Sequence, residues 1–342
     1  MTTKTDNSDQ DDQEENTPHV RVLSATRDQP PQPPKGTAAM NAHDRIEEAL
    51  LSALVLGSLA PPAAAGAADP AGCPPKLQAA VRHAVFPGGA RIRPQLCLAV
   101  ARACGDSDPR LTDAAAAAIE LLHCASLVHD DLPCFDDAAL RRGVASVHAA
   151  YGERIAVLTG DALIVLAFQV LAHGAEHAPQ RLPALVSLLA RRVGAPTGIV
   201  AGQAWECEPF VALPAYHRAK TGSLFSACTE AGALAAGADP QVWQAFGLCL
   251  GEAYQVADDI RDVAFTTDLL GKPNGRDLAL CRPSSATELG LSGAIAHFDQ
   301  LMARAVDAIP PCAGAAALRA LARAESERLV PQATVRDLAL AA

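Results

Sequence analysis

The sequence predicts an all-α protein in which long helices pack into one bundle. Hydrophobic residues make up 50% of the chain but aromatic residues only 4%, and alanine runs recur, a composition that favours packed helices over sheets. No segment shows the alternating β-branched and aromatic residues that predict strands. Several predicted helices are apolar nearly all round, which indicates buried members at the centre of a large bundle.

The chain divides by composition into a tail and a helical region. Residues 1–40 are acidic at first and proline-rich later (QPPQPPKG), so they cannot bury enough apolar surface to fold and are predicted to be a disordered tail. Residues 41–342 are predicted to form a single all-α domain. Its first helix is NAHDRIEEALLSALVLG, where a capping Asn or Asp precedes apolar residues at helical spacing. The Ala/Pro/Gly stretch 57–75 is predicted to be a loop.

The remaining helices follow in order. The segment KLQAAVRHAVFPGGARIRPQLCLAVARACG predicts a helix, a Pro-Gly-Gly turn, and a second helix entered through Arg93 and Pro94. Further helices are predicted for DAAAAAIELLHCASLVHDD, GDALIVLAFQVLAHGAEH, LPALVSLLARRVG, YHRAKTGSLFSACTEAGALAAG, VWQAFGLCLGEAYQVADDIRDV, FDQLMARAVDAI and AALRALARAESERLV.

Charge, cysteine usage and hydropathy exclude several classes of protein. The net charge is -10 and no Lys/Arg-rich tract occurs, which argues against nucleic acid as a partner. The ten cysteines form no CxxC pair, as expected for buried thiols in a reducing cytoplasm. The N-terminus lacks the pattern of a secretory signal, and Pro61-Pro62 interrupts the uncharged stretch 49–68. We therefore expect a soluble, cytoplasmic protein that does not span a membrane.

Two acidic clusters end long apolar segments. The first, VHDDLPCFDDAALRRG, includes Asp130 and Asp136, and Pro133 between them should end or bulge the helix because it lacks a backbone donor. The second is YQVADDIRDV, in which Asp258 and Asp262 lie four apart and so share one helix face. A single acidic pair is usually a solvated helix face. Two clusters of like charge at the edge of an apolar core would destabilise the fold unless a cation bound between them.

Carboxylates alone are the ligands of a hard divalent ion, and Mg²⁺ usually takes one or two of them together with substrate phosphates. The clusters therefore predict a magnesium-held diphosphate between two helices. Basic residues near the clusters and the Gly-Gly turn suit phosphate oxygens, although each one alone could equally be solvated or pair with a carboxylate. They are Arg91, Arg93, Arg141, Arg142, Lys220 and Lys272.

The sequence closely resembles the trans-type isoprenyl diphosphate synthases. The first cluster matches that family's first aspartate-rich motif in its longer form, DDxxxxD, at Asp130, Asp131 and Asp136, followed by LRRG. The second motif is matched by YQVADDIRD. Other matches are PGGARIRP, IELLHCASLVHDD, GDAL, GQ, KTG and GKPNGRD, in the family's order from about residue 40 to the C-terminus.

The resemblance implies an isoprenoid-synthase-type helical bundle around a central apolar cavity, a homodimer, and a chain-elongating prenyltransferase whose substrates are isopentenyl diphosphate and allylic diphosphates. Three sets of residues carry over from the family. Magnesium would be held by Asp130, Asp136 and Asp258, with Asp131 and Asp262 nearby. The departing diphosphate would be bound by Arg141, Lys220, Thr221 and Lys272, helped by Gln255. Isopentenyl diphosphate would be bound by Arg93, His123 and Arg142.

Two alternatives within or near this fold remain. Terpene cyclases also carry DDxxD, but the all-aspartate second motif and the second diphosphate pocket favour a chain-elongating enzyme. The other alternative is a non-catalytic regulatory subunit, because Ala90 stands where the family has a lysine that contacts isopentenyl diphosphate. Losing one charge-assisted contact of roughly 1.5–3 kcal/mol would weaken that binding. Both aspartate motifs are complete, which favours an active enzyme.

The resemblance also bears on product length, which this family sets on the helix that enters the first motif. Ala125 stands where farnesyl-type bacterial enzymes often have a blocking aromatic residue, with Ser126 beside it and Leu122 one turn deeper. The chain most resembles bacterial enzymes that make geranylgeranyl diphosphate (C20) for carotenoid and bacteriochlorophyll synthesis. Farnesyl diphosphate (C15) is the alternative product.

Overall fold

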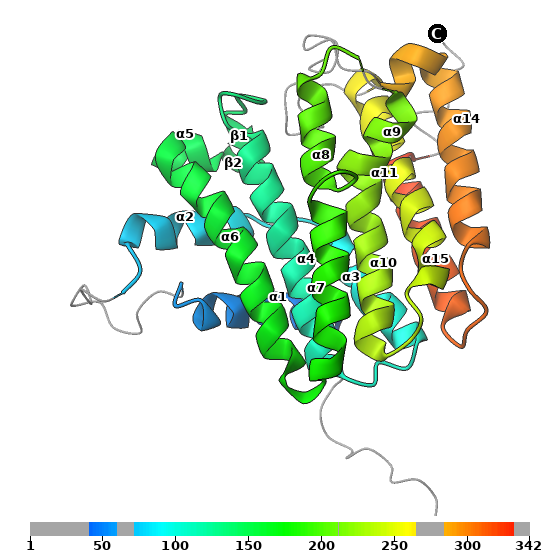
Figure 1. The fold of residues 1–342 in the computed structure, drawn as a ribbon. Helices are drawn as coiled ribbons and strands as arrows, with labels where there is room; N and C mark the ends of the chain where they lie inside the picture. The colour runs from blue at the N-terminus through cyan, green and yellow to red at the C-terminus, as the bar shows by residue number, and fades with distance from the viewer. Residues whose placement is uncertain (1–40, 60–71, 211, 265–283, 332–342) are drawn as a thin grey trace, which may run out of the picture. The chain divides into compact units, whose positions relative to one another are not determined.

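The computed structural model describes residues 41–59, 72–210, 212–264 and 284–331. The predicted tail over 1–40 and Lys272 with its GKPNGRD motif lie outside these residues. Met40–Ala342 form one compact unit, and Figure 1 shows its longer helices running side by side.

The described elements are almost all helices. The α-helices are α1 (Ala42–Leu56), α2 (Pro75–Val85), α3 (Ile92–Ala103), α4 (Pro109–Asp130), α5 (Val147–Tyr151), α6 (Glu153–Gly174), α7 (Leu182–Val193), α8 (Ile199–Ala204), α9 (Leu213–His217), α10 (Ser223–Ala236), α11 (Gln244–Ala264), α14 (Ser285–Asp307) and α15 (Ala315–Leu329). Short 3-10 helices are η1 (Ala175–His177), η2 (Pro179–Arg181), η3 (Trp205–Cys207) and η5 (Gln241–Trp243), and η4 (Arg218–Gly222) is a π-helical turn.

Side-chain caps start four of the described helices, and α1, α4 and α14 are the longest of them. Asn41 accepts a hydrogen bond from the backbone N–H of Asp44 at 2.9 Å, which starts α1 where its sequence predicts. Asp108 caps α4 by accepting from the N–H of Leu111, and proline occupies the first helical position. Ser284 caps α14 in the same way. A cap therefore marks the beginning of each of these helices.

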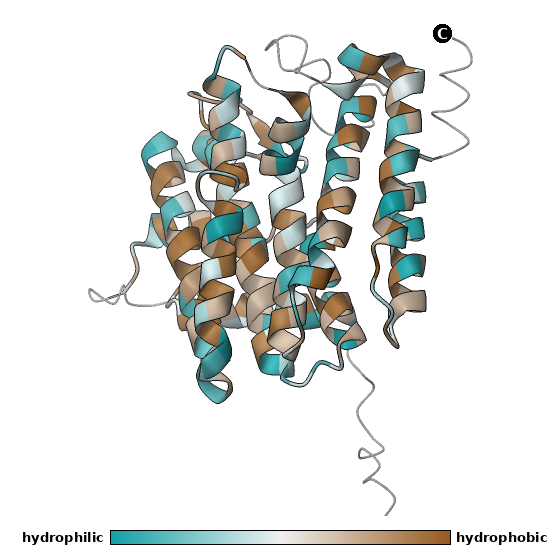
Figure 2. Ribbon diagram, turned by 45° about the vertical axis from the view of Figure 1, so that its right-hand side comes forward, coloured by the Kyte–Doolittle hydropathy of each residue, from teal (hydrophilic) through white to brown (hydrophobic). Residues whose placement is uncertain are grey.

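Two helices form the centre of the bundle. Sixteen residues of α4 and thirteen of α10 are buried, so both are enclosed on nearly every side. α4 packs against α3, α6 and α10, and α10 also packs against α7 and α11. In Figure 2 hydrophobic segments fill the middle of the helices, whereas hydrophilic residues gather toward helix ends and outer helices. The prediction of an all-α bundle with buried central helices is confirmed.

One small hairpin corrects the prediction that the chain has no strands. β1 (Leu140–Arg141) pairs antiparallel with β2 (Val144–Ala145). The turn between them has positive φ at both central residues, 52° at Arg142 and 80° at Gly143, which suits the twist of a two-residue hairpin. Strands of two residues are too short to show an alternating pattern, so they are not predictable from hydrophobic periodicity.

In the part of the chain that the structure describes, two helices are long and apolar enough to cross a membrane by length and composition alone. They are α4 and the segment Glu153–His177, which contains α6. Within the bundle 83% of the most apolar window of α4 is buried, as in the core helix of a soluble protein. The same measure is 44% for the segment that contains α6, which therefore presents an apolar face outward.

Candidate active site

The first acidic cluster forms where α4 ends. Asp130 is the last residue of the helix and Asp131 follows as its cap, so the chain leaves the helix before Pro133 as predicted. The loop then folds back, because the N–H of Asp136 donates to the carbonyl of Asp130 at 2.9 Å. The loop thereby returns toward the helix end, and the charge of Asp136 acts on Asp130.

Asp130 lies at the edge of the core. It is only 8% exposed, and this burial raises the pKa of its carboxyl group. The charge of Lys220 and a hydrogen bond from Gln203 Nε2 to Asp130 Oδ1, at 2.9 Å, act in the opposite direction. A buried carboxylate with one hydrogen bond and one cation nearby has capacity for a further positive ligand.

Asp131 points toward the hairpin. Its two carboxylate oxygens accept from Arg141 Nε at 3.0 and 3.2 Å, and a second guanidinium nitrogen also donates to it. Burial nevertheless raises the pKa of Asp131. Arg141, expected to bind diphosphate, is thus brought beside the first cluster, with its guanidinium bound to Asp131.

Lys220 and Thr221 lie in the π-helical turn η4, which precedes α10. Such turns widen a helix locally and are frequent at functional sites. Lys220 Nζ donates to Glu206, which also accepts from the hydroxyl of Tyr216. Burial opposes the charge of Lys220, but its electrostatic interactions with Tyr216, Asp130 and Glu206 raise its pKa above the ordinary value. Lys220 is therefore a permanent cation beside the first cluster.

Glu206 is a site residue that the sequence analysis missed. It belongs to η3 and lies three positions after Gln203, in GQAWE. Its only sequence signal was that proximity to the GQ motif, because one glutamate on a loop is ordinarily a solvated charge. Its contact with Lys220 depends on how α8 and η4 meet.

The packing of α8 and α11 against η4 depends on two glycines. A Cβ added at Gly202 of α8 would lie 2.3 Å from the Cα of Lys220, and one added at Gly251 of α11 would lie 2.6 Å from the Cα of Gly222. Both helices can therefore approach η4 only because these positions lack side chains. The approach places Thr221 Oγ1 2.7 Å from Gln255 Oε1, to which it donates.

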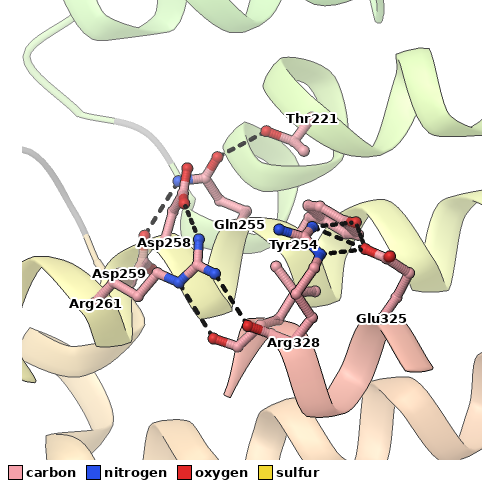
Figure 3. A network of polar contacts seen from close by, with 9 residues as sticks. Thr221, Tyr254, Gln255, Asp258, Asp259, Arg261, Glu325 and Arg328 are labelled. Carbon is pink, nitrogen blue, oxygen red and sulfur yellow. Dashed lines mark hydrogen bonds and ion pairs between the residues drawn. The ribbon is translucent and has the colours of Figure 1, made fainter. Parts of the chain in front are cut away.

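The second acidic cluster lies in the last turns of α11, where its aspartates differ in environment. The side chain of Asp258 is 54% exposed, with a guanidinium nitrogen of Arg261 at 3.8 Å, whereas Asp262 is buried. Asp258 and Asp262 are one turn apart on α11, as predicted. Asp258 is therefore the more exposed of the two, and Figure 3 shows it beside Arg261.

Asp259 has a structural position. It is 1% exposed, accepts from Gln255 Nε2 at 3.1 Å and accepts from the backbone N–H of Ser285 at 2.7 Å, which fixes the start of α14. Nε2 of His217 lies 3.4 Å away. Burial, together with His297 and Lys220, lowers the pKa of His217 to about 4, so this contact involves a neutral imidazole.

A second group of cations surrounds His123. Arg93 Nη1 donates to His123 Nε2 at 3.2 Å, and Arg142 donates to the carbonyl of Gly88 at 2.5 Å. Burial and then the charges of Arg93 and Arg142 hold the pKa of His123 well below its usual range, so the ring is neutral. Arg93 Nε and His123 Nδ1 are buried and have no hydrogen-bond partner among the described residues, as expected where a ligand completes the site.

Arg91 corrects the sequence analysis, which grouped it with the phosphate-binding arginines. It is 3% exposed and donates to Glu47 at 2.8 Å, to Glu120 at 2.7 Å and to the carbonyl of Val85 at 2.6 Å. Burial alone would lower its pKa, but the two glutamates raise it. Arg91 is thus a buried structural cation and cannot replace the lysine missing at Ala90, which is exposed.

The residues expected to set product length lie on α4. Leu122, Ala125 and Ser126 are all buried. Gln203 Nε2 donates to the carbonyl of Ser126 at 3.1 Å as well as to Asp130, so α8 covers this part of α4. A surface groove of about 540 Å³ between α1, α4 and α6 lies at the opposite end of α4 and contains none of the predicted site residues.

The donor chemistry fits magnesium. Within the described ranges no three His, Cys, Asp or Glu side chains come close enough to form a metal cage. Mg²⁺ usually binds one or two carboxylates and completes its shell with water and phosphate oxygens. The carboxylates of Asp130 and Asp136 in one cluster and Asp258 in the other fit an ion of that kind.

Comparisons with known proteins agree with this geometry. The polyprenyl synthetase family model matches residues 74–304. The chain is 50% identical over 292 residues to a geranylgeranyl diphosphate synthase of Cereibacter sphaeroides, covering 85% of this chain and 98% of that protein. It is 47% identical to the enzyme of the same name from Rhodobacter capsulatus, covering 85% and 97%.

Solved structures resemble it as well. A geranyltransferase from Legionella pneumophila superposes with a TM-score of 0.67 at 28% identity, covering 84% of this chain and 94% of that one. A geranyltransferase from Helicobacter pylori, complexed with magnesium and isoprenyl diphosphate, gives a TM-score of 0.63 at 31% identity, covering 79% and 92%.

Proposed function

The chain belongs to the polyprenyl synthetase family, and from this premise we propose that it condenses isopentenyl diphosphate with dimethylallyl, geranyl and farnesyl diphosphates to give geranylgeranyl diphosphate. One observation carries the proposal. Asp130 ends α4 and Asp258 lies in the last turns of α11, and η4 presents Lys220 to the first cluster and Thr221 to Gln255. A separate cation pocket surrounds His123. Two diphosphate sites are what a condensation of two diphosphates requires.

The allylic diphosphate would bind at the aspartate clusters. Asp130, Asp136 and Asp258 would hold magnesium, with Asp131 and Asp262 nearby. When bound, magnesium would neutralise diphosphate oxygens as a Lewis acid. Lys220 is half-buried and its pKa is raised, so it is a cation placed to stabilise the negative charge that develops on the departing diphosphate. The remaining proposed contacts to this diphosphate are Arg141, Thr221, Gln255 and Lys272.

Isopentenyl diphosphate would bind at Arg93, His123 and Arg142. The neutral His123 offers Nδ1 as a hydrogen-bond donor, and Arg93 offers its unpaired Nε. Between the two sites, the C–O bond of the allylic diphosphate breaks and the isopentenyl alkene forms a new C–C bond to that carbon. A proton then leaves the isopentenyl unit and restores the double bond. The buried residues of α4 and α10 exclude water from the cation.

The alternatives are not favoured. Relatives at 50% and 47% identity over almost their whole length are named geranylgeranyl diphosphate synthases, which supports an active enzyme with a C20 product over a C15 enzyme or a non-catalytic subunit. We place the product in carotenoid and bacteriochlorophyll synthesis on the sequence resemblance.

We also propose a soluble, cytoplasmic homodimer. α6 supports the dimer, because Leu158 and Val165 are 52% and 68% exposed and lie seven positions apart, on one face of that helix. A second copy of the chain would cover this apolar face.

The metal assignment is tested by Asp130→Asn and Asp258→Asn. Each change removes one negative charge at nearly constant shape, so magnesium-dependent turnover should fall at least about a hundredfold, by analogy with the loss of a main electrostatic contact to a transition state. Asp307→Asn, at an exposed position on α14, is the matched control and should keep wild-type turnover.

Folding of the variants is checked separately from their turnover. Circular dichroism should show unchanged helicity in all three variants. Wild-type turnover in Asp130→Asn or in Asp258→Asn would contradict the metal assignment.

A further inference from the structure

The guanidinium of Arg93 is in contact with one member of an aromatic pair, Phe225 and Tyr254. The guanidinium carbon of Arg93 lies 4.8 Å from the centroid of the Phe225 ring, a cation–π contact. The rings of Phe225 and Tyr254 are 4.5 Å apart, tilted by 37°. Among the residues that the structure describes, Arg93 has no ion-pair partner, and its Nε is buried and unpaired. Its place is therefore set by His123 on one side and by the face of Phe225 on the other.

The far end of this aromatic pair is held by α15. The hydroxyl of Tyr254 donates to Glu325, and Arg328 Nη2 donates to the oxygen of Tyr254 at 2.9 Å (Figure 3). Arg328 also binds Glu325 Oε2, from Nε at 3.0 Å and from Nη2 at 2.8 Å. Burial and the contact with Glu325 raise the pKa of Tyr254, so its hydroxyl remains a donor.

α15 is itself fixed to the second aspartate cluster. Arg261 Nε donates to the carbonyl of Leu329 at 3.2 Å, and Arg261 Nη2 donates to that of Arg328 at 3.4 Å. The third nitrogen of this guanidinium lies 3.8 Å from Asp258 (Figure 3). Glu325 is 8% exposed, so the junction of α11 and α15 is buried around it.

We propose that Glu325 is a positioning residue for the isopentenyl diphosphate site, because it fixes Tyr254, which supports Phe225 and through it the guanidinium of Arg93. The inference rests on the proposed function. Neither ring is charged, so the link transmits orientation and leaves the charges at the diphosphate sites unchanged. Disturbing it should affect binding of isopentenyl diphosphate more than binding of the allylic diphosphate.

The test compares steady-state kinetics of Glu325→Ala with those of the full-length wild type. The KM for isopentenyl diphosphate should rise about five- to tenfold, because a misplaced binding group loses substrate affinity, while the KM for farnesyl diphosphate stays within about twofold. Glu325→Gln keeps an oxygen that can accept from Tyr254 and should restore most of the affinity. Glu327→Ala, on the exposed side of α15, is the matched control and should resemble the wild type.

A double-mutant cycle separates positioning from general destabilisation. In an Arg93→Lys background the contact with Phe225 is already altered, so adding Glu325→Ala should change the KM for isopentenyl diphosphate by less than about twofold. If Glu325→Ala does not fold, Tyr254→Phe takes its place, because it removes only the hydroxyl and keeps the ring pair.

The outcomes separate this inference from the proposed function. An active wild type whose Glu325→Ala and Tyr254→Phe variants keep the wild-type KM for isopentenyl diphosphate would overturn the inference alone. Equal rises in the KM for both substrates would also overturn it, since they would indicate a general structural effect. A folded wild type without elongation activity would overturn the proposed function and the inference with it.

Discussion

At the scale of single residues, two cations of the proposed site are paired with carboxylates of the protein. Lys220 donates to Glu206, and Arg141 binds Asp131. Magnesium diphosphate carries both positive and negative charge. Its ions can therefore replace the partners in these two ion pairs without leaving a buried charge uncompensated. Pairing of this kind keeps long cationic side chains near the site before substrate arrives.

An exposed thiol inside the first cluster reports on ligand binding without activity. Cys134 lies between Asp131 and Asp136 and is exposed, whereas burial raises the pKa of Cys124 to about 12 and keeps it unreactive. At a concentration of Mg²⁺-diphosphate about ten times its dissociation constant, maleimide labelling of Cys134 should slow about tenfold.

Peptide mass spectrometry measures this protection. Cys73, half-buried before α2, should label at the same rate with and without Mg²⁺-diphosphate, and Cys124 should label only after unfolding. Equal labelling rates at Cys134 in both conditions would contradict the placement of the diphosphate at the first cluster.

Sequence reasoning identified the aspartates because clustered like charges at the end of an apolar segment need a cation. It failed for Arg91, because one arginine in a loop gives no sign that Glu47 and Glu120, from two other helices, will enclose it. It missed Glu206 for the same reason. Local charge patterns are visible in sequence, whereas partners that tertiary packing supplies are not.

At the scale of elements, apolar periodicity located most helices but not all of their ends. α14 begins at Ser285, well before the predicted start at Phe298, and Gly290, with a φ of 68°, kinks it. Gly and Ser in this part gave a weak helical pattern. The π-helical turn η4 was not predictable either, because it depends on the approach of α8 and α11 at Gly202 and Gly251.

We propose that Ala125 on α4 limits product length. Replacing Ala125 by tyrosine should block growth of the prenyl chain, so the main product should change from C20 to C15 in chromatography of the dephosphorylated alcohols. Ala125 is 1% exposed, so the larger side chain also overpacks the core, at a cost of about 1–3 kcal/mol in the free energy of unfolding.

Ala125→Leu is the graded control for this prediction. Its product distribution should fall between those of the wild type and Ala125→Tyr, and thermal unfolding should confirm that both variants are folded at the assay temperature. Unchanged C20 output from folded Ala125→Tyr would refute the assignment of Ala125 to the end of the chain's path.

At the scale of the whole molecule, the described bundle leaves the apolar face of α6 with Leu158 and Val165 exposed. Val165→Glu places a charge in the proposed interface, where an unpaired carboxylate is costly, so the population of dimers should fall in favour of monomers. Light scattering after size-exclusion chromatography measures the mass.

The control for the dimer is a charge change on another exposed surface. Arg323→Glu, on α15, should leave the mass unchanged. A wild type with the mass of one chain would rule out the homodimer, and a dimeric Val165→Glu variant would place the interface away from α6.

Sizing the products of the purified wild type shows whether this bundle extends an allylic diphosphate to C20. The protein is supplied with Mg²⁺, labelled isopentenyl diphosphate and, in separate reactions, dimethylallyl, geranyl or farnesyl diphosphate. We predict one main C20 alcohol after dephosphorylation with every starter, and none when a chelator removes magnesium. Products that stop at C15, or folded protein that extends none of the three starters, would contradict the proposed synthesis of geranylgeranyl diphosphate.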